Sequence, residues 1–125
     1  YSSAFKRDPN VAAEALKIAN YSCENDANHR TFITSFGHQF MEAHHLVPME
    51  FYEKFEFDID VPENVVSLCP NCHRAFHHAE WKQKSELIEK FFEQRFQKIH
   101  ARGIVLDLSS LKEFYQRIGE EINNN

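Results

Sequence analysis

The segment ENVVSLCPNCHRAFHH, residues 63–78, places an apolar run, two cysteines and three histidines directly after one another. Its NVVSLC part has the β-branched and apolar composition of a short strand. The CPNC part that follows presents two thiols to one metal ion at the two-residue spacing found in zinc sites. Because HRAFHH predicts a short helix, the segment predicts a strand, a metal-binding turn and a helix in immediate succession.

A redox-active dithiol is the competing interpretation of Cys69 and Cys72. That motif is expected where a helix starts after a strand in a thioredoxin-like βαβ unit, and the surrounding sequence shows no such pattern. The chain has three cysteines, an odd number that an all-disulfide framework cannot use, which favours a reduced, cytosolic setting. A zinc site is therefore the preferred interpretation.

A closed structural zinc site needs four ligands. The upstream stretch CENDANH, residues 23–29, offers a third cysteine and a histidine with five residues between them. Asp26 or His38 in place of His29 is left open, although a Cys/His set suits zinc better than a carboxylate does. The predicted ligands of structural Zn²⁺ are Cys23, His29, Cys69 and Cys72.

The stretch EAHHLVP, residues 42–48, places two adjacent histidines in an apolar run typical of a buried strand. Side chains alternate faces along a strand, so His44 and His45 are expected to point to opposite sides. A packing role can account for at most one of the two. For the pair taken alone, one buried core histidine beside one solvated neighbour is the favoured interpretation, and the other motifs of the chain make the pair a candidate functional site.

His73 and His77 stand four residues apart, so they share one face of the predicted helix and can bind one metal ion together. The zinc-protease motif HExxH has the same spacing but requires a glutamate as general base at its second position. That position is Arg74 in this chain, which argues against a metalloprotease.

Helices are predicted on both sides of these motifs. Residues 9–20 combine an Asp-Pro start with apolar residues at helical spacing. Residues 82–103 carry a broad apolar stripe that stops at a glycine, and a last helix is expected to begin after Asp107 or Ser109.

The stretch RTFITSFGHQFMEAHHLVP, residues 30–48, predicts two β-rich segments around the turn TSFG. The stretch that follows, residues 49–63, is too aromatic for a loose linker and is expected to pack over the site. No apolar run approaches the roughly 20 residues of a membrane span, so no membrane partner is expected.

The order MEAHHLVP, ENVVSLCPNCH, HRAFH resembles the HNH nucleases, which have the ββα-metal fold. The resemblance covers about residues 21–79, and it is closest to the zinc-bearing branch found in restriction endonucleases. It implies an α+β fold in which a ββα-metal core with a zinc knuckle is flanked by an N-terminal helix and C-terminal helices over about 80–122. Residues 1–125 are expected to form one domain, a piece of a longer protein because the chain begins at Tyr1.

The resemblance implies a role for each histidine of the site. His44, His73 and His77 are the expected ligands of a catalytic divalent metal. His45 is the expected general base, a task that suits an imidazole because its ordinary pKa of about 6.5 lies near working pH. His78 is adjacent to a ligand and could compete for the metal.

Two further positions match the family pattern. Asn64 is expected to hydrogen-bond across the long loop and hold the histidine strand in place, with Asn71 as the alternative. Glu42 matches a carboxylate that orients a metal ligand, although a solvated strand carboxylate is left open.

The implied reaction is hydrolysis of DNA phosphodiester bonds with a single metal ion, which gives 5′-phosphate and 3′-hydroxyl ends. Magnesium is the expected cellular metal, while imidazole ligands also accept Mn²⁺, Ni²⁺, Co²⁺ or Zn²⁺. The expected setting is the cytoplasm of a bacterium or archaeon, in a restriction enzyme that can depend on base modification.

The charge of the chain is unusual for a DNA-binding protein, because its formal net charge is −5 and its pI is about 5.9. We therefore expect a separate module of the full-length protein to supply most of the affinity for double-stranded DNA. Cleavage of both strands would favour a homodimer. The local cations that can contact phosphates are Arg30, Arg74, Lys82 and Lys84, although solvated helix faces explain these residues equally well.

A non-catalytic zinc module that binds DNA or protein is the alternative function. It predicts one tightly held metal and no cleavage. A purely structural zinc site, however, does not require the four histidines His44, His45, His73 and His77.

Overall fold

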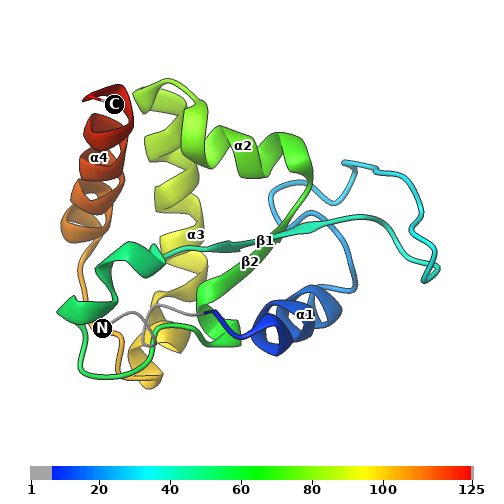
Figure 1. Ribbon diagram of the computed structural model, residues 1–125, viewed down its shortest axis with the longest axis horizontal. Helices are drawn as coiled ribbons and strands as arrows, with labels where there is room; N and C mark the ends of the chain where they lie inside the picture. The colour runs from blue at the N-terminus through cyan, green and yellow to red at the C-terminus, as the bar shows by residue number, and fades with distance from the viewer. Residues whose placement is uncertain (1–6, 125) are drawn as a thin grey trace.

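The computed structural model describes residues 7–124 of the chain (Figure 1). Its elements, in chain order, are α1 (Pro9–Ile18), β1 (Glu42–His45), the 3₁₀-helices η2 (Met49–Lys54) and η3 (Pro62–Asn64), β2 (Val65–Leu68), α2 (Pro70–His78), α3 (Trp81–Ala101) and α4 (Leu108–Asn124).

The two strands pair antiparallel, with Glu42 opposite Leu68 and His45 opposite Val65. Helix α2 starts two residues after β2 ends, so β1, β2 and α2 form the predicted ββα unit. All four residues of β2 are buried, which fits its uninterrupted apolar sequence. The expected α+β class with a ββα core is confirmed.

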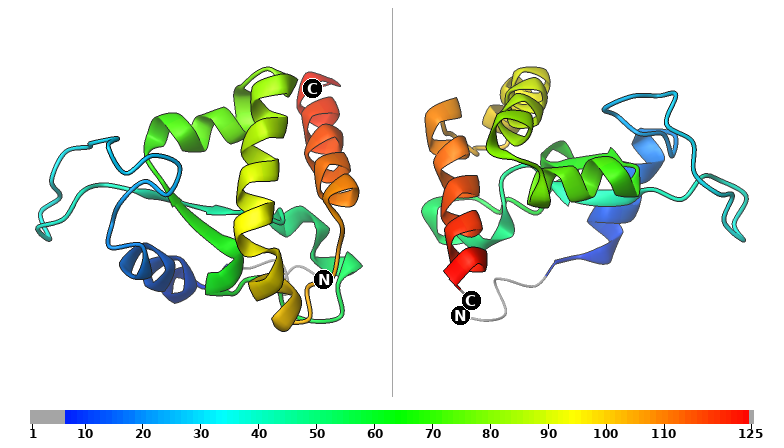
Figure 2. Two further views of the ribbon diagram at one scale, coloured as in Figure 1. Left: turned by 180° about the vertical axis from the view of Figure 1, so that it is seen from behind. Right: turned by 90° about the horizontal axis from the view of Figure 1, so that it is seen from above.

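The short sheet lies between α1 on one side and α2 on the other (Figure 1). Helix α3 packs against α2, and α4 lies beside α3, as both views of Figure 2 also show. The core that joins these elements is apolar and fully buried; its largest members are Phe76, Phe91, Leu46, Met49 and Ile59.

Local signals fix where the helices begin. The Asp8 carboxylate accepts a hydrogen bond from Asn10 N at 2.9 Å, and Pro9 occupies the first turn of α1. Asp107 caps α4 in the same way, by accepting from Ser110 N at 2.8 Å. Of the two expected starts of the last helix, the structure therefore selects Asp107.

The helices end close to their expected limits. Helix α1 stops two residues early, because Asn20 and Tyr21 adopt left-handed backbone with φ of 55° and 52°. Gly103 follows α3 with a φ of 86°, and a Cβ atom at this position would collide with the ring of Phe57. Only glycine fits here, which explains the end of α3.

The segment before β1 differs from the expected pair of strands. The TSFG turn forms, with Thr34 N donating to His38 O at 2.7 Å and Gly37 at a φ of 92°. Ile33 and Gln39, however, make a single isolated bridge. Phe32 and Ile33 are more than 60% exposed, so no packed face extends the bridge into a strand. This segment projects from the body of the molecule (Figure 2).

Over residues 7–124, no helix is both long and apolar enough to cross a bilayer.

Candidate metal centres and active site

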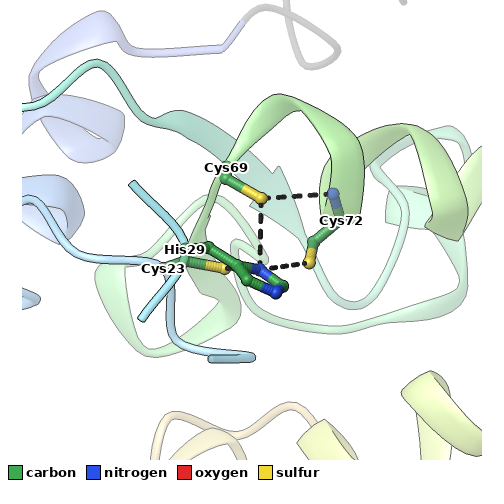
Figure 3. Close-up of side chains that lie close together, drawn as sticks. All are labelled: Cys23, His29, Cys69 and Cys72. Atoms are coloured by element: carbon green, nitrogen blue, oxygen red, sulfur yellow. Dashed lines mark hydrogen bonds between the residues drawn. The ribbon is translucent and has the colours of Figure 1, made fainter. Parts of the chain in front are cut away.

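Three buried free cysteines and one histidine converge where α2 begins (Figure 3). The Nδ1 atom of His29 lies 3.8 Å from Cys23 Sγ, 3.5 Å from Cys69 Sγ and 3.4 Å from Cys72 Sγ. Tetrahedral zinc with Zn–S of about 2.3 Å and Zn–N of about 2.0–2.1 Å requires sulfur–nitrogen separations of about 3.6 Å. The donor atoms therefore have the type and spacing of a Cys3His zinc site.

The structure brings His29, rather than Asp26 or His38, to the three thiols. Asp26 Oδ2 lies 3.6 Å from His29 Nε2, the ring nitrogen that does not face the sulfur atoms. His38 stacks on Tyr21, with ring centroids 3.6 Å apart, and its Nδ1 contacts Gln39 O. Asp26 is thus placed to orient the histidine, as outer carboxylates do at zinc sites.

The surroundings of the thiols affect them unequally. Burial raises the pKa of the Cys23 thiol, but hydrogen bonds from the backbone of Cys69 and Asp26 outweigh it and lower that pKa to about 7. Burial and the neighbouring thiols raise the pKa of Cys72 to about 12, although Asn25 Nδ2 donates to its sulfur at 3.3 Å. A divalent cation among the thiols would favour the thiolates, because its charge replaces the solvation lost on burial.

The segment that carries Cys23 is joined to β2 by hydrogen bonds. Glu24 N donates to Ser67 O at 2.9 Å, and Ser67 N donates to Glu24 Oε2 at 2.7 Å. Ser67 Oγ also donates to Ser22 O at 2.8 Å. These bonds hold Cys23 at the same end of the sheet as the CPNC turn.

A second cluster joins β1 to α2. His44, His73 and His77 each offer one nitrogen, and these atoms lie within 4.8 Å of one another. The two helical histidines approach most closely, with Nε2 atoms 3.3 Å apart. Burial lowers the pKa of His44 well below its usual value and also lowers the pKa of His77. Neutral imidazoles are the form that binds a metal, so the cluster fits a divalent cation.

Two of these histidines are oriented by partners from other elements. Glu42 Oε1 accepts from His73 Nδ1 at 2.8 Å, which is the arrangement of an orienting carboxylate rather than a solvated one. His44 Nε2 lies 2.8 Å from the hydroxyl of Tyr115 in α4. His78 is exposed and is not a member of the cluster.

His45 diverges from His44, as expected for neighbours on a strand. His44 faces α2 and α4, whereas His45 Nε2 lies 2.7 Å from Asp60 Oδ1. Asp60 is 7% exposed, and its second oxygen accepts from Asp8 N at 2.7 Å. The His45 ring is thereby fixed between β1 and the start of α1.

Both histidines nevertheless line one cavity of about 450 Å³. The side chains around it include Arg7, His44, His45, His73, His77 and Lys84. Lys84, from α3, is only 8% exposed and donates to His77 O at 3.2 Å. Burial lowers the pKa of its ammonium group. A hydrolytic site could thus combine a metal cluster, an oriented imidazole and a cation in this cavity.

Asn64 is fully buried and connects the two ends of the loop between the strands. Its Oδ1 accepts from Val47 N at 2.8 Å, and its Nδ2 donates to Val47 O at 3.1 Å and to Ile59 O at 2.9 Å. Asn71 is exposed in the first turn of α2. The structure therefore places Asn64, not Asn71, where it can fix the chain just beyond the histidine strand.

Asp60 and Tyr115 were not predicted as site residues. Asp60 is one of several acidic residues in the loop 49–63, and Tyr115 lies 71 residues from His44. No local spacing distinguishes either residue, so only the folded chain reveals its contact.

Residues 26–81 match the HNH endonuclease family, and the predicted resemblance is confirmed. The chain is 35% identical over 88 residues to the Type IV methyl-directed restriction enzyme EcoKMcrA of Escherichia coli K12, a match that covers 70% of this chain and 29% of that protein. It also resembles the structure of the Type IV phosphorothioation-dependent restriction endonuclease ScoMcrA, with a TM-score of 0.53 and 26% identity over 88% of this chain and 20% of the other. The chain thus spans less than a third of either relative.

Proposed function

Because residues 26–81 belong to the HNH endonuclease family, we propose that this chain hydrolyses DNA phosphodiester bonds with one divalent cation held by His44, His73 and His77. The observation that carries the proposal is the shared cavity, where these three imidazoles meet a fourth, His45, that a buried carboxylate orients. A zinc-binding module without activity does not need this second arrangement.

In the proposed reaction, His45 is the general base. Its Nε2 proton bonds to Asp60, so the lone pair on Nδ1 is left to take a proton from the attacking water. When bound, the cation would act as a Lewis acid that polarises the phosphate and stabilises the leaving 3′ oxygen. The expected products are 5′-phosphate and 3′-hydroxyl ends. In the cell we expect the cation to be Mg²⁺.

Lys84 is the proposed phosphate-binding residue of the cavity. Its ammonium group is held beside His77 and needs an anionic partner there, because a buried cation is costly without one. A non-bridging phosphate oxygen supplies that charge. Lys84 thus provides local attraction to DNA in a chain whose net charge is −5.

The proposed substrate is double-stranded DNA that carries a modification. Both relatives bear names of Type IV restriction enzymes, one methyl-directed and one phosphorothioation-dependent. The acidic charge of this chain favours recognition of the modification by a module outside these 125 residues. We further propose that two copies cooperate to cut both strands, in the cytoplasm of a prokaryote.

The test is a plasmid-nicking assay with Mg²⁺, Mn²⁺, Co²⁺, Ni²⁺ and Zn²⁺, combined with metal analysis of the purified protein. The nuclease predicts a tightly held zinc, a weaker second metal and metal-dependent nicking. One tightly held metal and no nicking with any cation would instead support the alternative, a non-catalytic zinc module that binds DNA or protein.

A further inference from the structure

The hydroxyl of Tyr115 is buried against the histidine strand. Tyr115 lies in α4 and is 4% exposed. Its oxygen is 2.7 Å from Leu46 O, 3.4 Å from His45 O and 2.8 Å from His44 Nε2. One side chain from the C-terminal helix therefore contacts three consecutive residues of the segment that carries both paired histidines.

Counting protons assigns the direction of each hydrogen bond. A carbonyl oxygen can only accept, so the single phenol proton of Tyr115 goes to Leu46 O, the nearer of the two carbonyls. The phenol oxygen must then accept from His44, which requires a proton on His44 Nε2.

We infer that Tyr115 is a positioning residue that fixes His44 as its Nε2–H tautomer and leaves the Nδ1 lone pair for the catalytic cation. The inference rests on the proposed metal-binding role of His44. It extends the metal site to α4, which lies beyond the residues 26–81 that match the family.

His73 is fixed by a comparable contact, but through Nδ1 rather than through Nε2. Glu42 accepts the proton of His73 Nδ1, which leaves Nε2 facing His77 Nε2 at 3.3 Å. His44 would thus bind through Nδ1 and His73 through Nε2, each held by a different element. Removal of such outer partners typically lowers metal affinity about 10–100-fold.

Helix α4 is anchored firmly enough to position the phenol. Phe114, next to Tyr115, stacks on Phe51 of η2 with ring centroids 4.2 Å apart. Leu111 is fully buried, and Lys112 Nζ lies 2.7 Å from Glu89 Oε2 of α3. These contacts do not involve the Tyr115 hydroxyl, so Tyr115→Phe should keep the helix in place.

The test combines NMR with a Ni²⁺ titration of the full chain after its Cys3His site has been loaded with zinc. Two-bond ¹H–¹⁵N spectra of the wild-type protein should show His44 protonated on Nε2 and not on Nδ1. In Tyr115→Phe, His44 should populate both tautomers, and the affinity for Ni²⁺ should fall about 10–100-fold while the melting temperature changes little. Tyr52→Phe, which removes a hydroxyl bonded to exposed Glu53, is the matched control and should bind Ni²⁺ as wild type does.

If the NMR spectra of the wild-type protein show His44 protonated on Nδ1, the inference is overturned by that result alone. An unchanged tautomer and unchanged Ni²⁺ affinity in Tyr115→Phe would overturn it as well. If the tautomer and the affinity behave as expected but wild-type protein nicks no plasmid with any cation, the positioning role stands and the proposed nuclease function fails.

Discussion

Replacing Asp60 with asparagine should slow DNA cleavage far more than it destabilises the fold. The carboxylate accepts two hydrogen bonds through separate oxygens, from His45 Nε2 and from Asp8 N, both at 2.7 Å. Asparagine has nearly the same shape but offers one oxygen and one NH₂ group. Two donors must therefore compete for a single acceptor.

Either outcome of that competition can be followed from the geometry. If the amide oxygen stays with Asp8 N, the NH₂ group faces His45 Nε2, whose proton must then move to Nδ1, the nitrogen proposed as the base. Losing the base or its correct tautomer costs about 10²–10⁴-fold in rate. If the oxygen stays with His45, the NH₂ group instead faces the Asp8 N–H, and two donors oppose each other because a backbone N–H cannot give up its proton. The first arrangement is therefore favoured, since His45 can satisfy it by changing its tautomer.

The assay is single-turnover plasmid nicking beside thermal unfolding, for Asp60→Asn in the wild-type and His45→Ala backgrounds. The substitution should slow nicking about 10²–10⁴-fold in the first background and have little further effect in the second, because the two residues act through one contact. Glu86→Gln, the same chemical change on the exposed face of α3, should leave the rate unchanged. An Asp60→Asn protein that is folded and nicks at the wild-type rate would refute the reasoning, as would equal losses in both backgrounds.

Two further predictions test the proposed roles in the cavity. His45→Ala should keep the catalytic metal and nick DNA about 10²–10⁴-fold more slowly, whereas His73→Ala should bind that metal more weakly and regain activity with added cation. Metal titration by calorimetry and nicking rates measure both effects. Metal loss in His45→Ala together with metal retention in His44→Ala would reverse the roles assigned to His44 and His45. Lys84→Met should nick more slowly and bind DNA with a smaller salt dependence, while Lys98→Met, at an exposed lysine of the same helix, should match wild type. Equal behaviour of the two variants would exclude a phosphate contact by Lys84.

The ββα unit could be predicted because its signals are local. The CPNC spacing, the four-residue separation of His73 and His77, and the adjacent histidines each fix geometry within one turn or one strand. Helix limits followed from caps for the same reason, as Asp107 shows. The strand expected before the TSFG turn is reduced to one bridge, because local β propensity around Ile33 finds no sheet face to pack on.

Among the partners that orient the histidines, Asp60 and Tyr115 could not be predicted and Glu42 only as one of two alternatives, because tertiary contacts select them. Glu42 was ambiguous in the sequence, and only its 2.8 Å contact with His73 distinguishes it from a solvated carboxylate. The sequence of the loop does not distinguish Asp58 from Asp60. In the structure, Asp58 is exposed and accepts a hydrogen bond from Asp60 N, while Asp60 is buried against His45. The sequence thus identifies which groups can do chemistry, and the fold decides which are held in place.

The proposed zinc site and the proposed catalytic metal site both include residues of α2. We expect loss of the first to disturb the second, but not the reverse. Cys69 and Cys72 lie at the start of this helix, where the Cys69 thiol also caps it by accepting from Cys72 N at 3.5 Å. His73 follows directly, so zinc bound by these cysteines would fix the helix that presents the proposed catalytic ligands. Zinc binding contributes about 10–16 kcal/mol in small structural sites, which exceeds or equals the stability of a typical domain.

Cys69→Ser should accordingly lower zinc content, melting temperature and Ni²⁺ affinity at the histidine cluster together. His77→Ala should lower only the Ni²⁺ affinity of the histidine cluster and leave zinc content and melting temperature near wild type. His77 is exposed and lies about one turn of α2 beyond Cys72. Metal analysis, thermal unfolding and Ni²⁺ titration of both variants measure this asymmetry. Unchanged zinc content and melting temperature in Cys69→Ser would show that the four residues do not hold a structural zinc, and zinc loss in His77→Ala would show that the dependence runs in both directions.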